Sequence, residues 1–486
     1  MNKHKIAARP EDERLPLGVT IAYGIQHVLT MYGGIIAPPL IIGSMAGLNG
    51  SEIGVLITAC LFMGGLATIL QTVGIPLFGS QLPLVQGVSF AGVATMGAIV
   101  TSGGGLPAIF GSVIVASVIG LLIAPVFATI IRFFPPVVTG AVITTIGLTL
   151  LPVAAGWAMG GNSSAPDYGA PENLLLAAIT FLIVLALSKV SIGVISRLSI
   201  LLAIVVGTIV AALLGRVDFS TVGDGPIFAL PSPFAFGMPT FEIAAIISMF
   251  IVILVTLTET TADILAVGEI VGTKVDSKRI AAGLRADMLS SAVSPVFGSF
   301  TQSAFAQNVG LVAITGVKSR FVVTAGGVVL VLLGLLPVLG RVVAAVPAPV
   351  LGGAGIVLFG SVAASGIRTL AKVDYRGNMN LIIVASAIGI GMLPIAAPTI
   401  YDQMPAWFTT IFHSGISSAA VTAILLNLLF NHLGKKPGKD ASVFAAAPTR
   451  NIPVAYLDAF EDGDSIVDGK IVDKHGNEVK AEPSGQ

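Results

Sequence analysis

GSFTQSAFAQNVGLVAITG, residues 298–316, interrupts an otherwise apolar chain. Its polar side chains belong to Thr301, Gln302, Ser303, Gln307, Asn308 and Thr315. An ordinary membrane-crossing helix needs about 20 mostly apolar residues. Polar groups persist at membrane depth only where they face protein or a water-filled cavity. We therefore expect this stretch to form one half of a binding site inside a membrane protein.

The composition is that of a polytopic membrane protein. Of the 486 residues, 55% are hydrophobic and 10% are charged, and the mean hydropathy is +0.95. Acidic and basic residues balance at 25 each, which gives no indication of a nucleic-acid partner. The single cysteine, Cys60, lies in an apolar run, so the sequence predicts neither a disulfide nor a cysteine metal site. We expect no cofactor.

Apolar runs predict an all-α fold with fourteen membrane-spanning segments. They divide the chain into a cytoplasmic N-terminal segment (1–16), a first group of seven spans (17–215), an extracytoplasmic loop (216–240), a second group of seven spans (241–433) and a cytoplasmic C-terminal tail (434–486). The predicted spans are 17–35, 53–73, 84–100, 107–131, 137–151, 174–190, 198–214, 241–267, 280–296, 298–316, 321–339, 350–366, 380–396 and 416–433.

The basic residues agree with this topology. With the N-terminus inside, only Arg216 and Arg341 lie outside, which leaves 23 of the 25 Lys and Arg residues on the cytoplasmic side. Cytoplasmic loops are enriched in these residues. One missed or invented span in the middle would reverse every later segment and destroy the bias. We therefore expect both termini to be cytoplasmic.

An internal repeat relates the two groups of spans. PVVTGAVITTIG at 136–147 matches PVLGGAGIVLFG at 349–360, with a constant offset of 213 residues and identity at six of twelve positions. These segments open the fifth and twelfth spans, and a separation of seven spans implies opposite orientations in the membrane. A shared bias toward Gly, Val and Ala is the alternative explanation. An inverted repeat is typical of secondary transporters whose site lies where discontinuous helices meet.

The repeat predicts a partner for residues 298–316 in the first half. GSQLPLVQGVSFAGVATMG, residues 79–97, lies at an offset near 220 and begins with the same Gly-Ser pair. It places Gln86 against Gln307 and is interrupted by Pro83 and Gly87. Two half-helices would then offer unpaired backbone N–H groups to a polar ligand.

The eighth span carries carboxylates at membrane depth. Thr256, Glu259, Thr260 and Asp263 fall at i, i+3, i+4 and i+7, which places them on one helical stripe. Ionised groups inside a membrane are costly and mark functional sites by default. The alternative for Glu259 and Asp263 is a structural pair bonded to neighbouring helices. We expect Glu269 to lie at the cytoplasmic interface.

For the other candidate site residues, a purely structural role stands beside the functional one. Asp287 follows Arg285 by two residues, and a cap or salt bridge there is as reasonable as a role in transport. His27, deep in the first span, is more often a hydrogen-bonded support than a ligand. Phe90 and Phe305 belong to the paired half-spans, where they either pack or clamp a flat ring.

These residue types suit a small planar ligand rich in N–H and C=O groups, together with protons. One proton moving down about 100 mV supplies roughly 2.3 kcal/mol. That free energy supports about a 50-fold solute gradient, which is enough to drive uptake.

The chain resembles the nucleobase-ascorbate transporter family, also called nucleobase:cation symporter 2. Its signature is Gln, Glu or Pro, then Asn, any residue, Gly, four residues, Thr, and Arg, Lys or Gly. The fixed positions are matched by Gln307, Asn308, Gly310, Thr315 and Gly316. Gln26-His27, Ser89-Phe90 and the acidic eighth span match as well.

The resemblance implies two inverted seven-span repeats arranged as core and gate domains, with short strands before the two half-helices. It further implies a homodimer and an elevator-like movement of the core. Glu259 and Gln307 would bind a base that Phe90 and Phe305 sandwich, and Asn308 and His27 would brace the site. Asp263 and Asp287, with Glu259, would support proton coupling.

Gln at the first signature position resembles xanthine and uric acid carriers, whereas uracil carriers tend to have Glu and ascorbate carriers Pro. We therefore predict a proton-coupled purine symporter of a bacterial inner membrane, importing urate or xanthine. The rivals are a uracil or other nucleobase permease and an anion carrier of the sulfate/bicarbonate group, which the two carboxylates suit poorly. An intramembrane enzyme is disfavoured because His27 has no HExxH motif and no buried Cys beside it.

Overall fold

The computed structural model describes residues 9–127, 131–189, 193–223, 225–375 and 379–433, and 465–467, 470–472 and 478–479 near the C-terminus. The chain divides into two compact units, Met1–Ser442 and Val443–Gln486. The second unit contains a three-stranded antiparallel sheet of β3 (Ser465–Val467), β4 (Lys470–Val472) and β5 (Glu478–Val479), in that order. The remainder of the predicted tail lies outside the described residues.

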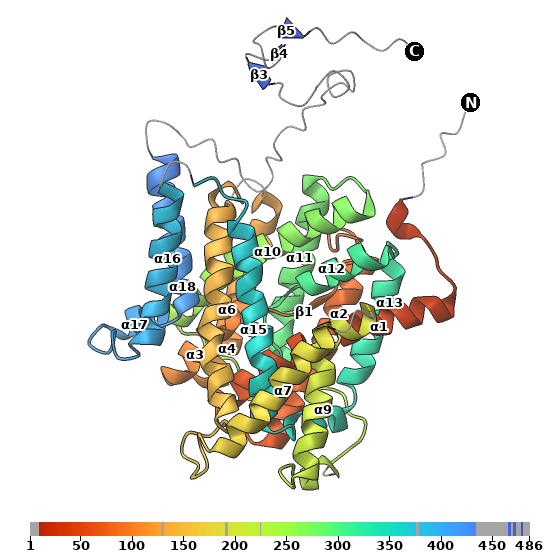
Figure 1. The fold of residues 1–486 in the computed structure, drawn as a ribbon, viewed down its shortest axis with the longest axis vertical. Coiled ribbons are helices and arrows are strands. Elements are labelled where there is room, and N and C mark those ends of the chain that lie inside the picture. The colour runs from red at the N-terminus through yellow and green to blue at the C-terminus, as the bar shows by residue number, and fades with distance from the viewer. Residues whose placement is uncertain are drawn as a thin grey trace. The chain divides into compact units, whose positions relative to one another are not determined.

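The first unit is almost entirely helical (Figure 1). Its first half contains α1 (Leu17–Met45), α2 (Gly50–Val73), β1 (Gln86–Val88), α3 (Val93–Thr101), α4 (Gly105–Ile123), α6 (Pro136–Ala158), α7 (Pro171–Lys189), α8 (Gly193–Arg197) and α9 (Ser199–Leu213). Its second half contains α10 (Ile243–Val271), α11 (Ser277–Val293), β2 (Gln302–Ala304), α12 (Ala306–Thr315), α13 (Arg320–Gly334), α14 (Pro337–Ala344), α15 (Ala348–Leu370), α16 (Met379–Ala396), α17 (Ala406–Phe412) and α18 (Gly415–Asn427).

Short helical turns complete the described elements. The 3₁₀ turns are η1 (Pro10–Asp12), η2 (Phe90–Gly92), η3 (Ala124–Val126), η4 (Ile131–Phe133), η5 (Ser220–Gly223) and η6 (Ser294–Phe297). A π-helical turn, η7 (Leu428–His432), extends α18.

Nine helices in the described residues are long and apolar enough to cross a membrane. The helices α13 and α14 make a tenth if the pair, bent by 79°, counts as one span. The break falls before Pro337, which has no backbone N–H to continue the helix, so the predicted span 321–339 is not one straight helix. The count is below fourteen because α3, α9, α11 and α12 have 9, 15, 17 and 10 residues.

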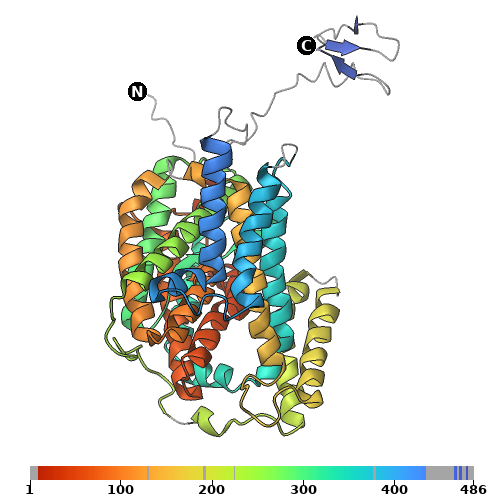
Figure 2. The same cartoon turned by 90° about the vertical axis from the view of Figure 1, so that its left-hand side faces the viewer.

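The helices of this unit pack in two groups (Figures 1 and 2). In one group, α1 and α2 pack against α13, and α4 packs against α10 and α11. In the other, α15 packs along α6 and α7, and α18 packs against α16 and α6. The two segments of the predicted repeat open α6 and α15, each of which has 23 residues. Glycines such as Gly147 and Gly366 allow these two backbones to approach closely.

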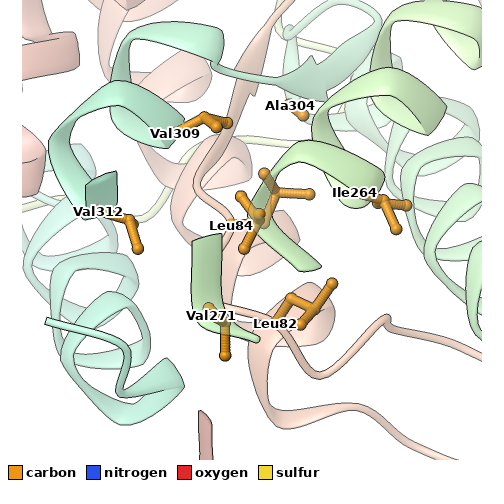
Figure 3. Close-up of a cluster of buried hydrophobic side chains, with 8 residues drawn as sticks. Leu82, Leu84, Ile264, Val271, Ala304, Val309 and Val312 are labelled. Carbon is orange, nitrogen blue, oxygen red and sulfur yellow. The ribbon is translucent and has the colours of Figure 1, made fainter. Parts of the chain in front are cut away.

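An apolar cluster holds the two strands against α10 and α12 (Figure 3). It comprises Leu82, Leu84, Ile264, Val267, Val271, Ala304, Val309 and Val312. These side chains come from the segment before β1, the second half of α10, the end of β2 and the inner face of α12. Burying a Leu or Val side chain stabilises a fold by about 1.5–3 kcal/mol, so the cluster fixes the strands relative to both helices.

Candidate binding site

The strands β1 and β2 bring the two polar stretches together. They pair antiparallel, with Gln86 opposite Ala304, Gly87 opposite Ser303 and Val88 opposite Gln302. Two further backbone bonds extend the pairing, from Ser89 N to the Thr301 carbonyl at 2.8 Å and from Phe305 N to the Val85 carbonyl at 3.1 Å. Because the strands are antiparallel and each leads directly into a short helix, η2–α3 and α12 leave the two-stranded sheet at opposite ends, each with its amino end at the sheet. The short strands expected at the site are therefore present.

The sequence-based match of Gln86 with Gln307 is wrong in its register. Gln86 and Gln302 each begin a strand, at an offset of 216 residues, whereas Gln307 lies in the first turn of α12. Gln86 is fully buried, and Gln307 is exposed. The segment between the Gly-Ser pair and the strand is a few residues longer in 79–97 than in 298–316. An offset near 220, taken from the Gly-Ser pair, therefore matched Gln86 with the wrong residue.

A cavity of about 230 Å³ lies beside α12. Its walls come from α1, α9, α12 and α15, with Arg197 at the end of α8. Phe305 and Gln307 both line it, and Thr30, Arg197 and Ser361 supply its other polar side chains. The cavity therefore combines an amide, hydroxyl groups and a guanidinium with an aromatic ring.

The rings of Phe90 and Phe305 approach each other at Gly34 of α1. A β-carbon on Gly34 would lie 2.8 Å from Phe305 Cε1 and 3.6 Å from Phe90 Cε2, so glycine leaves room for both rings. Phe305 is buried and forms part of the cavity wall. Phe90 is half-buried and packs edge-on against Phe359, with ring centroids 6.2 Å apart at 75°.

Asn308 and His27 form a buried pair between α12 and α1. Asn308 Nδ2 donates to the His27 carbonyl oxygen at 2.9 Å and lies 3.1 Å from His27 Nδ1. An amide nitrogen only donates, so this ring nitrogen accepts and a neutral imidazole carries its proton on Nε2. Neither residue lines the cavity, and the pair ties the signature helix to the first span.

The two acidic residues of α10 stand one helical turn apart. Glu259 and Asp263 are half-buried. Within the described part of the chain, neither carboxylate has a hydrogen-bond or salt-bridge partner, and neither lines the cavity. The structural pairing considered from the sequence is therefore not formed, and both groups stay available to a ligand or a proton.

Asp287 is buried on α11 and bonded to α10. Thr260 Oγ1 donates to Asp287 Oδ2 at 2.6 Å and accepts from Ala304 N at 3.3 Å. Arg285 instead donates to the Leu77 carbonyl at 3.3 Å, so the salt bridge considered from the sequence is absent among the described side chains. The sequence placed Thr260 on the polar stripe but gave no sign that it joins α11 to β2.

The family model described as "Permease family" (Xan_ur_permease) matches residues 18–400. "Uric acid transporter UacT" of Escherichia coli (strain K12) is 41% identical over 429 residues, covering 87% of this chain and 89% of the relative. "Xanthine permease" of Bacillus subtilis (strain 168) is 39% identical over 418 residues, covering 86% and 95%. "Uric acid permease PucJ" of the same strain is 40% identical over 416 residues, covering 85% and 92%.

Two solved structures share the fold at low sequence identity. The transmembrane domain of the cyanobacterium bicarbonate transporter BicA gives a TM-score of 0.54 at 16% identity, covering 83% of this chain and 96% of that one. The murine anion transporter Slc26a9 in its inward-facing state gives 0.60 at 13% identity, covering 97% and 74%.

Proposed function

The chain belongs to the nucleobase-ascorbate transporter family, and on that premise we propose that it imports urate or xanthine together with protons across a bacterial inner membrane. Family membership makes it a multi-pass membrane transporter of nucleobases rather than an enzyme. The observation that carries the substrate proposal is the joint position of Phe305 and Gln307 in the wall of one cavity. The relatives named as uric acid and xanthine carriers support it.

In this proposal a purine base lies beside the amino ends of the two short helices. The Gln307 amide offers one donor and one acceptor side to the edge of the base, and the Phe305 ring offers a flat apolar surface. The cavity of about 230 Å³ is smaller than the 300–1,000 Å³ common for drug-sized ligands, as suits a small bicyclic base. Phe90 would close on the opposite face of the base, and Glu259, which does not line the cavity, would accept one of its N–H groups where the base reaches toward α10.

Protons would be carried by Glu259, Asp263 and Asp287. The first two are half-buried carboxylates without a protein partner among the described residues, and the third is buried with one oxygen unpaired. Carboxylates inside a membrane protein are typical of proton relays. Asn308 and His27 would brace the site through the hydrogen bonds that join α12 to α1.

We further propose fourteen segments in two inverted repeats, forming core and gate domains of a homodimer with both termini in the cytoplasm. The helices that correspond in order have matching lengths, 29 residues in α1 and α10 and 23 in α6 and α15. Two packing groups support the division, one built on α1–α4 with α10–α13 and one on α6–α9 with α15–α18.

Uptake of labelled urate, xanthine, uracil and bicarbonate, measured in cells lacking their own carriers, tests the proposal. We expect uptake of urate or xanthine that a protonophore abolishes. Uracil uptake without purine uptake would overturn the substrate assignment. Bicarbonate uptake alone would favour the anion carrier with which the chain shares its fold.

A further inference from the structure

Side chains on one face of the β1–β2 pair point away from the cavity. Successive side chains of a strand alternate between its two faces. A β-carbon on Gly87 would lie 2.7 Å from Phe305 Cε2 and 2.8 Å from Met31 Cε, so the face of Gly87 and Ser303 is turned toward α1 and the site. Gln86 and Gln302 belong to the opposite face, and β2 packs there against α10 and α11.

Unpaired polar atoms gather on this second face. Both amide atoms of Gln86, Oε1 of Gln302 and Oδ1 of Asp287 are buried without a hydrogen-bond partner in the described part of the chain. The groups are neighbours, because Thr260 bonds both Asp287 and Ala304, and Ala304 lies opposite Gln86. An unsatisfied buried polar group costs about 1–3 kcal/mol, so several together indicate bound molecules that satisfy them.

The set of unpaired atoms continues one turn along α11. A β-carbon on Gly283 would lie 3.2 Å from Gln71 Nε2 and 3.2 Å from the Ser80 β-carbon. Gly283 precedes Asp287 by four residues, which separates their side-chain positions by about 6 Å. Gln71 Oε1 accepts from Ser80 N at 3.2 Å, but Gln71 Nε2 and Ser80 Oγ are buried and unpaired.

Beyond Ser80 lies the N-terminal turn η1. Arg279 Nε donates to the Ser80 carbonyl at 2.6 Å, and its Nη2 forms an ion pair with Glu11 Oε1 at 2.5 Å. Glu11 is fully buried, and its Oε2 has no partner among the described residues. Buried polar groups therefore recur from Glu11 through Ser80 and Gln71 toward Asp287, with the Ile264 methyl group also packed at Gly283.

We propose that the groups from Glu11 through Ser80, Gln71 and Asp287 to Gln86 hold a chain of water molecules that conducts protons to Asp287. This inference rests on the proposed proton coupling. It gives protons a route on the face of the β1–β2 pair opposite the substrate cavity. The route begins at the buried Glu11 of η1, at the end of the unit that is cytoplasmic in the proposed topology.

Water fits the unpaired atoms better than a metal ion does. The set contains two amide nitrogens that donate and four oxygens that accept, besides the Ser80 hydroxyl. A cation would need oxygen ligands alone, whereas water donates and accepts and typically makes two to four hydrogen bonds. In each hop one O–H bond breaks in the donating water and one forms in the next. The last hop places the proton on Asp287 Oδ1.

Few charged groups stand near Asp287. Of the elements packed on α11, α10 contributes Glu259, Asp263 and the exposed Glu269, α2 contributes Glu52 at its distant end, and α4 and β2 contribute none. On α11 itself the charged neighbours are Lys278, Arg279 and Arg285. Beyond the Arg279–Glu11 ion pair, the groups named between Ser80 and Asp287 are neutral.

The route is tested with the Gln71→Leu, Ser80→Ala and Gly283→Ala variants, each reconstituted in proteoliposomes that contain a pH-sensitive dye. The substrate is whichever of xanthine and urate the unchanged protein carries. We expect substrate-driven proton flux to fall at least tenfold in Gln71→Leu, while exchange of labelled for unlabelled substrate stays within about threefold. Gln71→Glu keeps a hydrogen-bonding side chain and should retain flux. Thr58→Val, which removes a buried hydroxyl of α2 bonded to its own helix, is the control.

The outcomes separate this inference from the proposed function. If unchanged protein moves substrate without proton flux, the proton-coupling proposal fails. The water route is refuted if the unchanged protein moves protons with substrate and if each of Gln71→Leu, Ser80→Ala and Gly283→Ala that still exchanges substrate moves protons at the normal rate. Ser80→Ala removes a single oxygen and keeps the test available if a larger substitution prevents folding. Equal flux loss in Gln71→Leu and Gln71→Glu would also refute the route.

Discussion

Replacing Glu259 by Gln should nearly abolish transport without destabilising the protein. The Glu259 carboxylate is half-buried on α10 and has no hydrogen-bond partner among the described residues. The amide has the same shape but loses the charge, so folding should change by less than about 0.5 kcal/mol. A hydrogen bond from a base to a charged group contributes about 1.5–3 kcal/mol. Its loss corresponds to about 10- to 150-fold in affinity, and the proton carried by the carboxyl is lost as well.

Binding of xanthine or urate to purified protein, thermal unfolding and labelled uptake together measure this. Glu269→Gln is the matched control, because Glu269 lies on the same helix and is exposed. We expect weak binding and no accumulation in Glu259→Gln, with unfolding midpoints of both variants near that of the unchanged protein. Equal transport loss in the two variants would refute the placement of the site.

Three further predictions concern single side chains. Gln307→Glu removes the donor half of the amide from the cavity wall and should weaken purine binding at least tenfold; unchanged affinity would count against a role in recognition. Thr260→Val leaves one Asp287 oxygen and a backbone N–H of β2 unpaired, each at about 1–3 kcal/mol, so its unfolding midpoint should fall. Thr261→Val removes only a bond within α10 and should shift the midpoint much less; similar shifts would contradict the linking role. Burial raises the pKa of Asp12, but hydrogen bonds from two arginine side chains outweigh it, and the pKa lies below its ordinary value of 3.8. The stability that Asp12 adds is therefore fully present above pH 3.8 and is lost as the pH falls through the folded-state pKa. Between these two pH values, the free energy of unfolding of Asp12→Asn should depend less on pH than that of the unchanged protein. An identical pH dependence would exclude this linkage.

The sequence predicted the short elements near residues 298–316 better than their contacts. Residues 298–316 could be recognised as an interrupted span because their polarity has no place in an ordinary span, and α12 is indeed only ten residues long. The register of its partner stretch could not be recognised. A repeat offset near 220 led from Gln86 to Gln307, whereas the structure starts β1 at Gln86 and β2 at Gln302, an offset of 216 residues.

The other contacts that the sequence did not predict join residues far apart in the chain. Thr260 and Asp287 are 27 residues apart, and only the packing of α10 on α11 brings them to 2.6 Å. Glu11 belongs to a polar terminal segment that gave no sign of burial, yet Arg279 of α11 holds it inside. Helical periodicity describes one face of one helix, so it cannot identify a partner on another element.

The accumulation ratio of labelled xanthine and urate in proteoliposomes measures proton-coupled purine import. With an imposed pH gradient, alkaline inside, we predict that one of these purines accumulates inside above its external concentration and that a protonophore collapses the gradient of purine. Accumulation that does not depend on the pH gradient or the protonophore would exclude proton coupling, as would equilibration of both purines without accumulation.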